Sequence, residues 1–231
     1  VKFTDITDST EPERLATIVN SYLSEMSAIA LEYGGTIDKF IGDAILIFFG
    51  DPETKGDVED ALSAIEMSIR MQKRVVELQK SWKKLGLTNG LTVRMGISTG
   101  FCTVGNFGSD LRLDYTVLGS PVNLAARLQG MAEPGEIVID ETTQNLVGDE
   151  LDVIKHKTFT PKGFVRPINT FKVGGFKKTE HRKLNRKLSR AGKRVEINVI
   201  DSSDIRAALE ELKQIQDAFE KEYAEDYQEK K

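Results

Sequence analysis

Two aspartates near the start of the sequence are of the type that holds metal ions. Two β-rich runs, Thr36–Ile41 and Ala44–Phe49, are separated by only two residues, Gly42 and Asp43. A two-residue loop that begins with glycine predicts a tight hairpin with the Asp43 carboxylate at its tip. Asp5 lies near the end of another run of alternating apolar and polar residues, Val1–Ile6. Because Asp also suits turns through local hydrogen bonds, Asp43 alone is equally well explained as a turn residue. A second carboxylate beside it would favour a metal ligand.

The polar cluster after Asp5 adds a candidate phosphate site. A proline follows this cluster, which predicts a helix start with Ser9 or Thr10 as the N-cap. Backbone amides at a helix N-terminus bind phosphate, and Mg²⁺ is often shared between carboxylates and substrate phosphates. Asp5 and Asp43 therefore form a candidate Mg²⁺ site if their strands are adjacent, the alternative being ordinary caps and turns.

Two further polar positions carry candidate chemistry. Asn123 and Arg127 are four residues apart on a predicted helix at Val122–Met131, so they share one face. A solvated pair is one interpretation. Because the remaining helix residues are mostly apolar, a pocket or an interface is the other. Lys162, beside Gly163, is equally well explained as a solvated turn lysine.

The hydrophobic pattern predicts the elements that must position these residues. The apolar run Ala44–Phe49 predicts a central buried strand, and Cys102 is predicted to be buried. In chain order the predicted elements are a strand at Val1–Ile6, a helix from Ser9 or Thr10 to Gly34, the hairpin, a helix at Val58–Leu85, strands at Leu91–Ile97, within Ser98–Gly108 and at Leu113–Leu118, a helix at Val122–Met131, a strand at Gly135–Asp140, a helix at Glu141–Val147 and a strand pair across Phe159–Val173.

Composition bounds the class of protein. With 231 residues, 39% hydrophobic and 29% charged, we expect one main domain and an appendage. The net charge of −4 gives no global attraction to nucleic acid. A single cysteine excludes an internal disulfide and fits a reducing, cytoplasmic setting. No apolar run approaches the ~20 residues of a membrane span. The chain starts inside a predicted strand, so we expect a piece of a longer protein with an upstream regulatory or membrane domain.

The composition changes after the paired glycines at 174 and 175. We therefore expect a main domain at 1–175, a basic linker at 176–194, and a strand and amphipathic helix at 195–231. The basic residues would suit a nucleic-acid or acidic-lipid patch. A solvated linker is favoured because this stretch has almost no aromatic residues.

Four motifs together carry a resemblance to a known family. FTDI, DKFIGDAILIFFG, VRMGISTG and DYTVLGSPVNLAARLQ follow one another in this order, and the sequence resembles the catalytic domain of class III nucleotidyl cyclases, especially bacterial adenylate cyclases. The resemblance covers Val1 to Val173. It implies an α+β fold, a ferredoxin-like βαββαβ core with antiparallel additions, followed here by the C-terminal strand and helix. It also implies a head-to-tail homodimer.

The resemblance assigns the metal site and the phosphate loop. Asp5 and Asp43 match the two metal-binding aspartates, and Ile6 would offer its backbone carbonyl, for two Mg²⁺ or Mn²⁺ ions per site. The phosphate loop departs from the family: where Gly-Phe-Thr is common, this chain has Asp8, Ser9 and Thr10. Backbone amides still suit phosphate there, although an acidic side chain adds negative charge.

The resemblance also assigns the residues that hold the nucleotide. Lys39 and Thr116 fall where the family reads the purine, Asn123 where it orients the ribose, Arg127 where it stabilises the reacting phosphate and Lys162 where it grips the terminal phosphates. Adenine offers N1 as an acceptor and N6 as a donor, whereas guanine reverses both, so a site built for one base leaves polar groups unpaired with the other. The lysine and threonine pair implies ATP.

The implied activity is an adenylate cyclase, a lyase that produces a signal. The ribose 3′-hydroxyl of ATP would attack the α-phosphorus to give 3′,5′-cyclic AMP and pyrophosphate, at active sites shared by two copies of the chain. Three alternatives stay open. They are a catalytically silent cyclase-like module that dimerises or senses nucleotide, a guanylate cyclase, and a diguanylate cyclase, whose Gly-Gly-Asp/Glu-Glu-Phe turn is absent from the hairpin.

Overall fold

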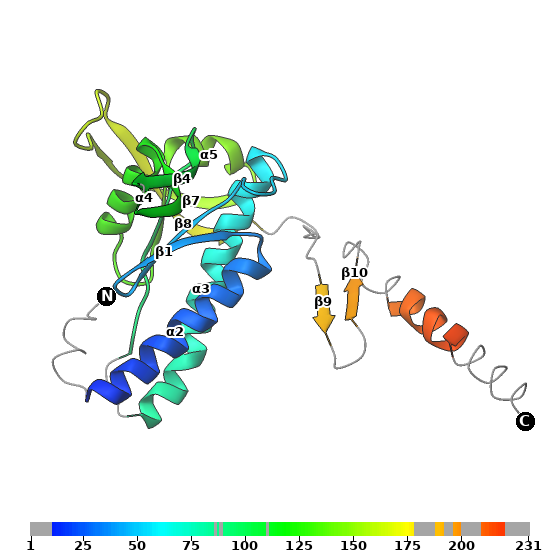
Figure 1. Ribbon diagram of the computed structural model, residues 1–231. Coiled ribbons are helices and arrows are strands. Elements are labelled where there is room, and N and C mark those ends of the chain that lie inside the picture. The colour runs from blue at the N-terminus through cyan, green and yellow to red at the C-terminus, as the bar shows by residue number, and fades with distance from the viewer. Residues whose placement is uncertain are drawn as a thin grey trace, which may run out of the picture. The chain divides into compact units, whose positions relative to one another are not determined.

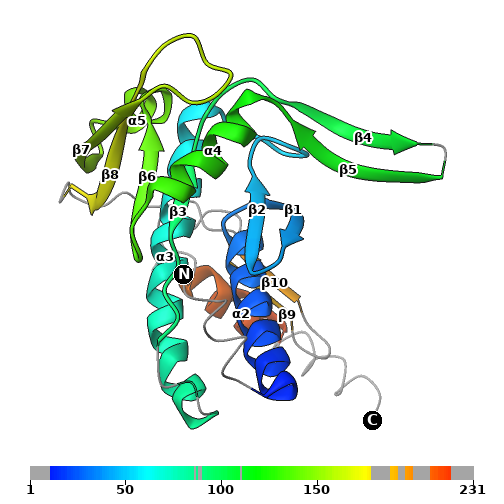
Figure 2. The same cartoon turned by 90° about the vertical axis from the view of Figure 1, so that its left-hand side faces the viewer.

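The computed structural model describes residues 11–85, 87, 90–109, 111–177, 188–191, 196–199 and 209–219. The chain divides into two compact units, Val1–Lys178 and Thr179–Lys231. The first unit is a mixed α+β domain, shown from two sides in Figures 1 and 2. In chain order its elements are α2 Pro12–Glu32, β1 Thr36–Ile41, β2 Ala44–Phe48, α3 Asp57–Lys84, β3 Met95–Ile97, β4 Thr103–Ser109, β5 Arg112–Leu118, α4 Ser120–Met131, β6 Ile137–Asp140, α5 Glu141–Val147, β7 Leu151–Phe159 and β8 Ile168–Phe176.

The strands described in the first unit form one sheet and two hairpins. The sheet has the order β3-β6-β8-β7, with β3 parallel to β6 and the other pairs antiparallel. The antiparallel pairs β1–β2 and β4–β5 are separate, and the β4–β5 hairpin reaches out from the body of the unit (Figure 2). The predicted α+β class is confirmed.

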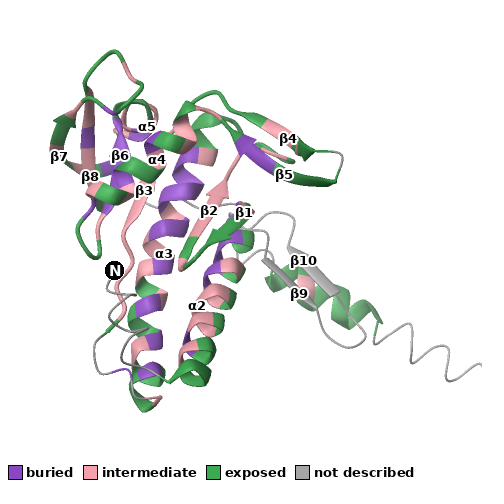
Figure 3. Ribbon diagram, turned by 60° about the vertical axis from the view of Figure 1, so that its left-hand side comes forward, coloured by how far each residue is buried: buried purple, intermediate pink, exposed green. Residues whose placement is uncertain are grey.

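The core lies between α3 and the sheet. Leu62 and Ile65 of α3 pack with Ile137 and Ile139 of β6, and Figure 3 shows the buried residues recurring along α3. Apolar residues spaced three and four apart give a helix one continuous buried face, which explains why this long helix follows the predicted bounds closely.

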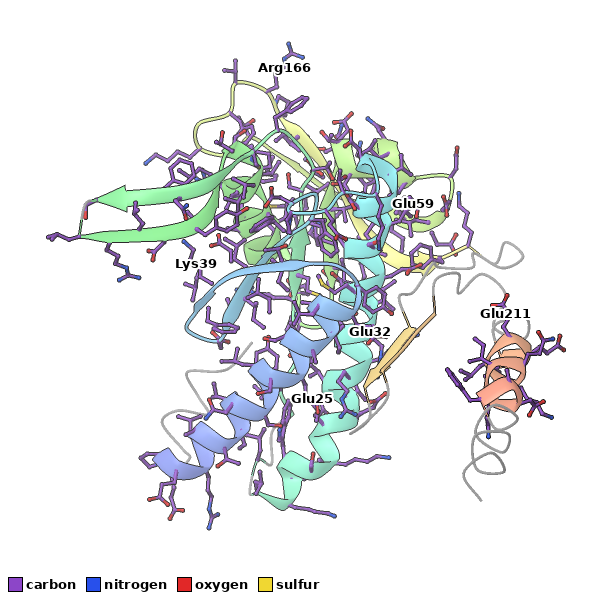
Figure 4. All side chains as sticks on the ribbon, turned by 45° about the vertical axis from the view of Figure 1, so that its right-hand side comes forward. Glu25, Glu32, Lys39, Glu59, Arg166 and Glu211 are labelled. Atoms are coloured by element: carbon purple, nitrogen blue, oxygen red, sulfur yellow. The ribbon has the colours of Figure 1, made fainter. Side chains whose placement is uncertain are left out.

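An ion pair joins α2 to α3, which lie side by side in Figure 1. Arg74 of α3 meets the carboxylate of Glu25 with Nε 2.8 Å from Oε2 and Nη2 2.9 Å from Oε1. Figure 4 labels Glu25 on α2. The hydrogen bonds from Arg74 lower the pKa of Glu25. This two-point contact fixes the helices in register more than it stabilises them, since the pair is partly exposed.

Two local predictions about the first helix and hairpin are wrong. The N-cap of α2 is Glu11, and its side chain makes no cap hydrogen bond. The helix starts here because Pro12 occupies the first helical position, where its missing N–H costs nothing. The residues expected to cap it, Ser9 and Thr10, lie outside the described residues. β2 is half-buried and pairs, within the described chain, with β1 alone. Its apolar sequence therefore does not by itself predict full burial.

Three predictions along the rest of the unit also need correction. Cys102 is exposed, because it lies in the connection before β4. Of the strand expected at 91–97, the structure forms β3, Met95–Ile97. Before Met95, one backbone hydrogen bond links this stretch to the segment that leads into β6, from the amide of Gly135 to the carbonyl of Val93. The pair expected across 159–173 has longer strands, β7 and β8, separated by a loop at 160–167.

The second unit contains an antiparallel pair, β9 Leu188–Ala191 and β10 Glu196–Val199, and helical residues at 209–219. β10 lies within the predicted strand at 195–200, whereas β9 falls inside the stretch expected to be a linker. The predicted strand at Val1–Ile6 lies outside the described residues. None of the helices described is long and apolar enough to cross a membrane.

The core contact of α3 gives a stability prediction. Ile65 is 0% exposed and Val76, on the same helix, is 63% exposed. We expect Ile65→Ala to lower the free energy of unfolding by about 2–5 kcal/mol, because it leaves a cavity, and Val76→Ala to change it by less than about 0.5 kcal/mol. Urea unfolding followed by circular dichroism measures both. Equal losses in the two variants would contradict the assignment of the buried face.

Candidate active site

Lys39 and Thr116 are brought together across β1 and β5. The hydroxyl of Thr116 donates to Oδ2 of Asp38 over 2.8 Å, and Nζ of Lys39 lies 3.6 Å from Oδ1 of the same carboxylate. The lysine is on the edge of the hairpin (Figure 4) and its side chain is 45% exposed. Thr116 is buried, 6% exposed. Two residues assigned to the base thus share one buried acid.

A second contact fastens β5 to the hairpin. The phenol of Tyr115 donates to the carboxylate of Asp51, and the backbone carbonyl of Asp51 accepts from the hydroxyl of Thr36 over 2.6 Å. The hydrogen bond to Asp51 raises the pKa of Tyr115. Together with the Asp38 contact, this holds Lys39 and Thr116 in a fixed relation.

Sequence reasoning missed Asp38. Acidic residues are depleted in strands and are almost never fully buried without a partner, so an Asp within a β-rich run beside a lysine was the available signal. The structure adds the reason: the register of β1 against β2 shifts between Ile37 and Lys39. A bulge of this kind re-aims a side chain, and the Asp38 side chain is 1% exposed.

Asn123 and Arg127 lie on the exposed face of α4. A neighbouring face of the helix buries Leu124 and Leu128 in a cluster against the sheet. The helix lies so close to β3 that a Cβ at Gly96 would overlap the Ala125 carbonyl and approach the Cβ of Leu128 to 2.8 Å. Because α4 has one buried face and no room to shift, its exposed polar pair has a fixed direction.

Lys162 lies in a turn of the β7–β8 loop. The amide of Phe164 donates to the carbonyl of Pro161 over 3.0 Å, and Gly163 has φ 92°, the left-handed geometry required at the third position of a type II turn. Phe164 packs against the same cluster as Leu128. Lys162 is exposed on a loop anchored where α4 is anchored.

Asp43 is in the turn between β1 and β2 and is half-buried. Burial first, and then the Asp43 charge, raise the pKa of Tyr22 on α2 to about 12. Among the described residues there is no cluster of three or more His, Cys, Asp and Glu. The other expected ligands and the phosphate loop lie outside the described part of the chain: Asp5, Ile6, Asp8, Ser9 and Thr10.

A second buried acid, Asp140, has a structural role. It caps α5 by accepting from the Thr143 amide over 3.1 Å and receives the Ser98 hydroxyl over 3.2 Å. Burial raises the pKa of Asp140 and these hydrogen bonds oppose that shift. Its bonding capacity serves the junction of β3, β6 and α5, so it is not a candidate for chemistry.

The family is decided by a comparison with protein-family models. Residues 1–173 match the adenylate and guanylate cyclase catalytic domain. The chain belongs to this family. Curated cyclase relatives include an adenylate cyclase of Anabaena cylindrica, 36% identical over 57% of this chain and 25% of that protein, and adenylate cyclase 1 of Rhizobium meliloti, 32% identical over 56% of this chain and 19% of that protein. The chain thus spans a quarter or less of the length of these relatives.

Solved structures show the same cyclase fold. The adenylyl cyclase CyaB from P. aeruginosa is 46% identical, with a TM-score of 0.73, over 76% of this chain and 90% of that one. The guanylyl cyclase Cya2 is 36% identical, with a TM-score of 0.71, over 78% of this chain and 89% of that one. The expected cyclase fold is therefore confirmed.

The effect of the Asp43 charge on the pKa of Tyr22 can be tested by titration. Asp43→Asn removes a nearby negative charge, so the pKa of Tyr22 should fall toward its ordinary value. NMR of ¹³C-labelled tyrosine between pH 9 and 11.5, with Tyr22→Phe for assignment, would show ionisation beginning at lower pH. The control is Asp152→Asn, which changes an exposed residue of β7. An unchanged Tyr22 titration in Asp43→Asn would mean that the Asp43 charge does not act on Tyr22.

Proposed function

We propose that this domain is an adenylate cyclase that converts ATP to 3′,5′-cyclic AMP and pyrophosphate. The observation that supports it is the pairing of Lys39 with Thr116. An ammonium can donate to adenine N1, and a hydroxyl oxygen can accept from the N6 amine. The 46% identity to an adenylyl cyclase supports the same base. A guanylate cyclase is the second candidate, since a solved guanylyl cyclase is 36% identical.

In this proposal the polar face of α4 acts on the reacting phosphate. The ribose 3′-oxygen bonds to the α-phosphorus while the bond from that phosphorus to the bridging oxygen breaks, and pyrophosphate leaves as the 3′ proton passes to water. Asn123 orients the ribose and Arg127 places its guanidinium on the charge that develops at phosphorus. Lys162 holds the terminal phosphates and so stabilises the leaving group.

The proposed metal site includes one described ligand. Asp43 offers hard oxygen donors from a half-buried turn, which suits Mg²⁺ or Mn²⁺, and Asp5 with the Ile6 carbonyl would complete the ligand set. Two such ions, when bound, offset the triphosphate charge and favour ionisation of the 3′-hydroxyl.

The proposed active unit is a head-to-tail homodimer. The two hairpins that carry Asp38, Lys39 and Thr116 expose several large apolar side chains, which monomeric surfaces rarely gather in one region. They are Phe40, Ile41, Leu113, Tyr115 and Leu118. In the proposed dimer, Asp43 of one protomer serves the nucleotide that is held by Lys39, Thr116, Asn123 and Arg127 of its partner.

Removing the guanidinium tests the transition-state role. Arg127→Ala should lower kcat for cyclic AMP formation by about 100-fold or more, with a smaller change in KM, because the contact forms in the transition state. Lys73→Ala, an exposed lysine on α3, should leave kcat within about twofold. Chromatography of the products from ATP or GTP with Mg²⁺ or Mn²⁺ measures this. Wild-type protein that makes cyclic GMP alone would overturn the proposed substrate.

Mixing two inactive chains tests the shared site. Asp43→Ala and Arg127→Ala should each be inactive, and their mixture should regain up to about a quarter of wild-type activity, because one of the two sites in each mixed dimer is intact and about half of randomly formed dimers are mixed. Analytical ultracentrifugation confirms that dimers form. A mixture that dimerises and stays inactive would refute the shared arrangement.

A further inference from the structure

We propose that Asp38 is a positioning residue that sets base specificity, an inference that rests on the proposed cyclase function. Its buried carboxylate takes the hydroxyl proton of Thr116 and so leaves the Thr116 oxygen able only to accept. An acceptor at this point matches the N6 amine of adenine and opposes the O6 carbonyl of guanine. Asp38 acts through Thr116 and touches no substrate.

The carboxylate of Asp38 is held in a buried position beside Thr116. The Asp38 side chain is 1% exposed, on a strand whose register shifts at this residue. Oδ2 accepts from Thr116 over 2.8 Å. Oδ1 is buried without a hydrogen bond, with Nζ of Lys39 3.6 Å away. A carboxylate kept out of water at this expense, by a bulge that aims it inward, serves a purpose beyond strand formation.

The direction of the hydrogen bond from Thr116 to Asp38 determines what the threonine can offer to a base. A threonine hydroxyl has one proton and two lone pairs, and an ionised carboxylate can only accept. The Thr116 proton is therefore committed to Asp38, and only lone pairs remain for a base. Guanine would place its O6 acceptor against these lone pairs and its N1–H against the Lys39 ammonium. Both contacts would then be unpaired, which is the kind of mismatch that gives strong discrimination.

Asp38→Asn is the informative change because it alters hydrogen-bonding capacity at nearly constant shape. The amide NH₂ can donate to the Thr116 oxygen, which frees the hydroxyl proton for guanine O6. We expect the ratio of kcat/KM for ATP to that for GTP to fall by at least about tenfold, with kcat/KM for GTP rising. Asp152→Asn makes the same change at an exposed residue of β7 and should leave the ratio within about twofold of the wild-type value.

The experiment separates positioning from folding, because a merely structural loss lowers activity with both nucleotides and leaves the ratio unchanged. In a Thr116→Val background, which has no hydroxyl to orient, Asp38→Asn should have no further effect on the ratio. If Asp38→Asn does not fold, Thr116→Ser and Thr116→Val replace it. The serine variant should keep the ratio and the valine variant should lose it.

The outcomes also distinguish this inference from the proposed function. Cyclic AMP from the wild type with an unchanged ratio in folded Asp38→Asn overturns the role of Asp38 alone. Cyclic GMP from the wild type overturns both. If the wild type makes neither product, the proposed function fails, and calorimetric Kd values for ATP and GTP then test Asp38 by the same ratio. Equal ratios in the two proteins would overturn it.

Discussion

The close packing of α4 on β3 at Gly96 is the contact on which the candidate site depends. No side chain fits between the helix backbone and this strand, and Leu124, Leu128, Ala132 and Val138 fill the space beside it. A helix held this tightly has one possible outward face, and that face carries Asn123 and Arg127. The loop of Lys162 is attached to the same cluster through Phe164. The residues proposed to act on the phosphates are therefore placed by one small apolar core.

The residues proposed to read the base belong to a separate arrangement. β5 is joined by polar contacts to β1 at Asp38 and to the loop after β2 at Asp51, so the relative position of β1 and β5 depends on hydrogen bonds more than on a core. Lys39 lies on β1, whereas Asp43 lies in the turn that follows this strand. In the proposed dimer these two residues of one hairpin serve different nucleotides.

How much the sequence could predict follows from the range of the interactions involved. The bounds of α3 follow from local periodicity and the start of α5 from the cap at Asp140, so the sequence predicts these helices closely, and the motif order indicates the residue types of the candidate site. The bulge at Asp38 depends on how β1 registers against β2 and on what β5 places beside it, which no local pattern contains. The half-burial of β2 and the exposure of Cys102 were missed for the same reason: apolar composition does not say which neighbours cover a strand or a loop.

Base selection in the proposed site depends on the direction of one hydrogen bond, because adenine and guanine differ little in size. The side chains of Lys39 and Thr116 differ in how freely they can reorient. Lys39 is 45% exposed on a flexible stem and can turn away from the N1–H of guanine, so its repulsion of the wrong base is weak. Thr116 is 6% exposed and its hydroxyl proton is held by Asp38, so it cannot reorient to suit a different base. The rigid member of the pair must therefore supply most of the discrimination, and the carboxylate behind it determines which base is accepted.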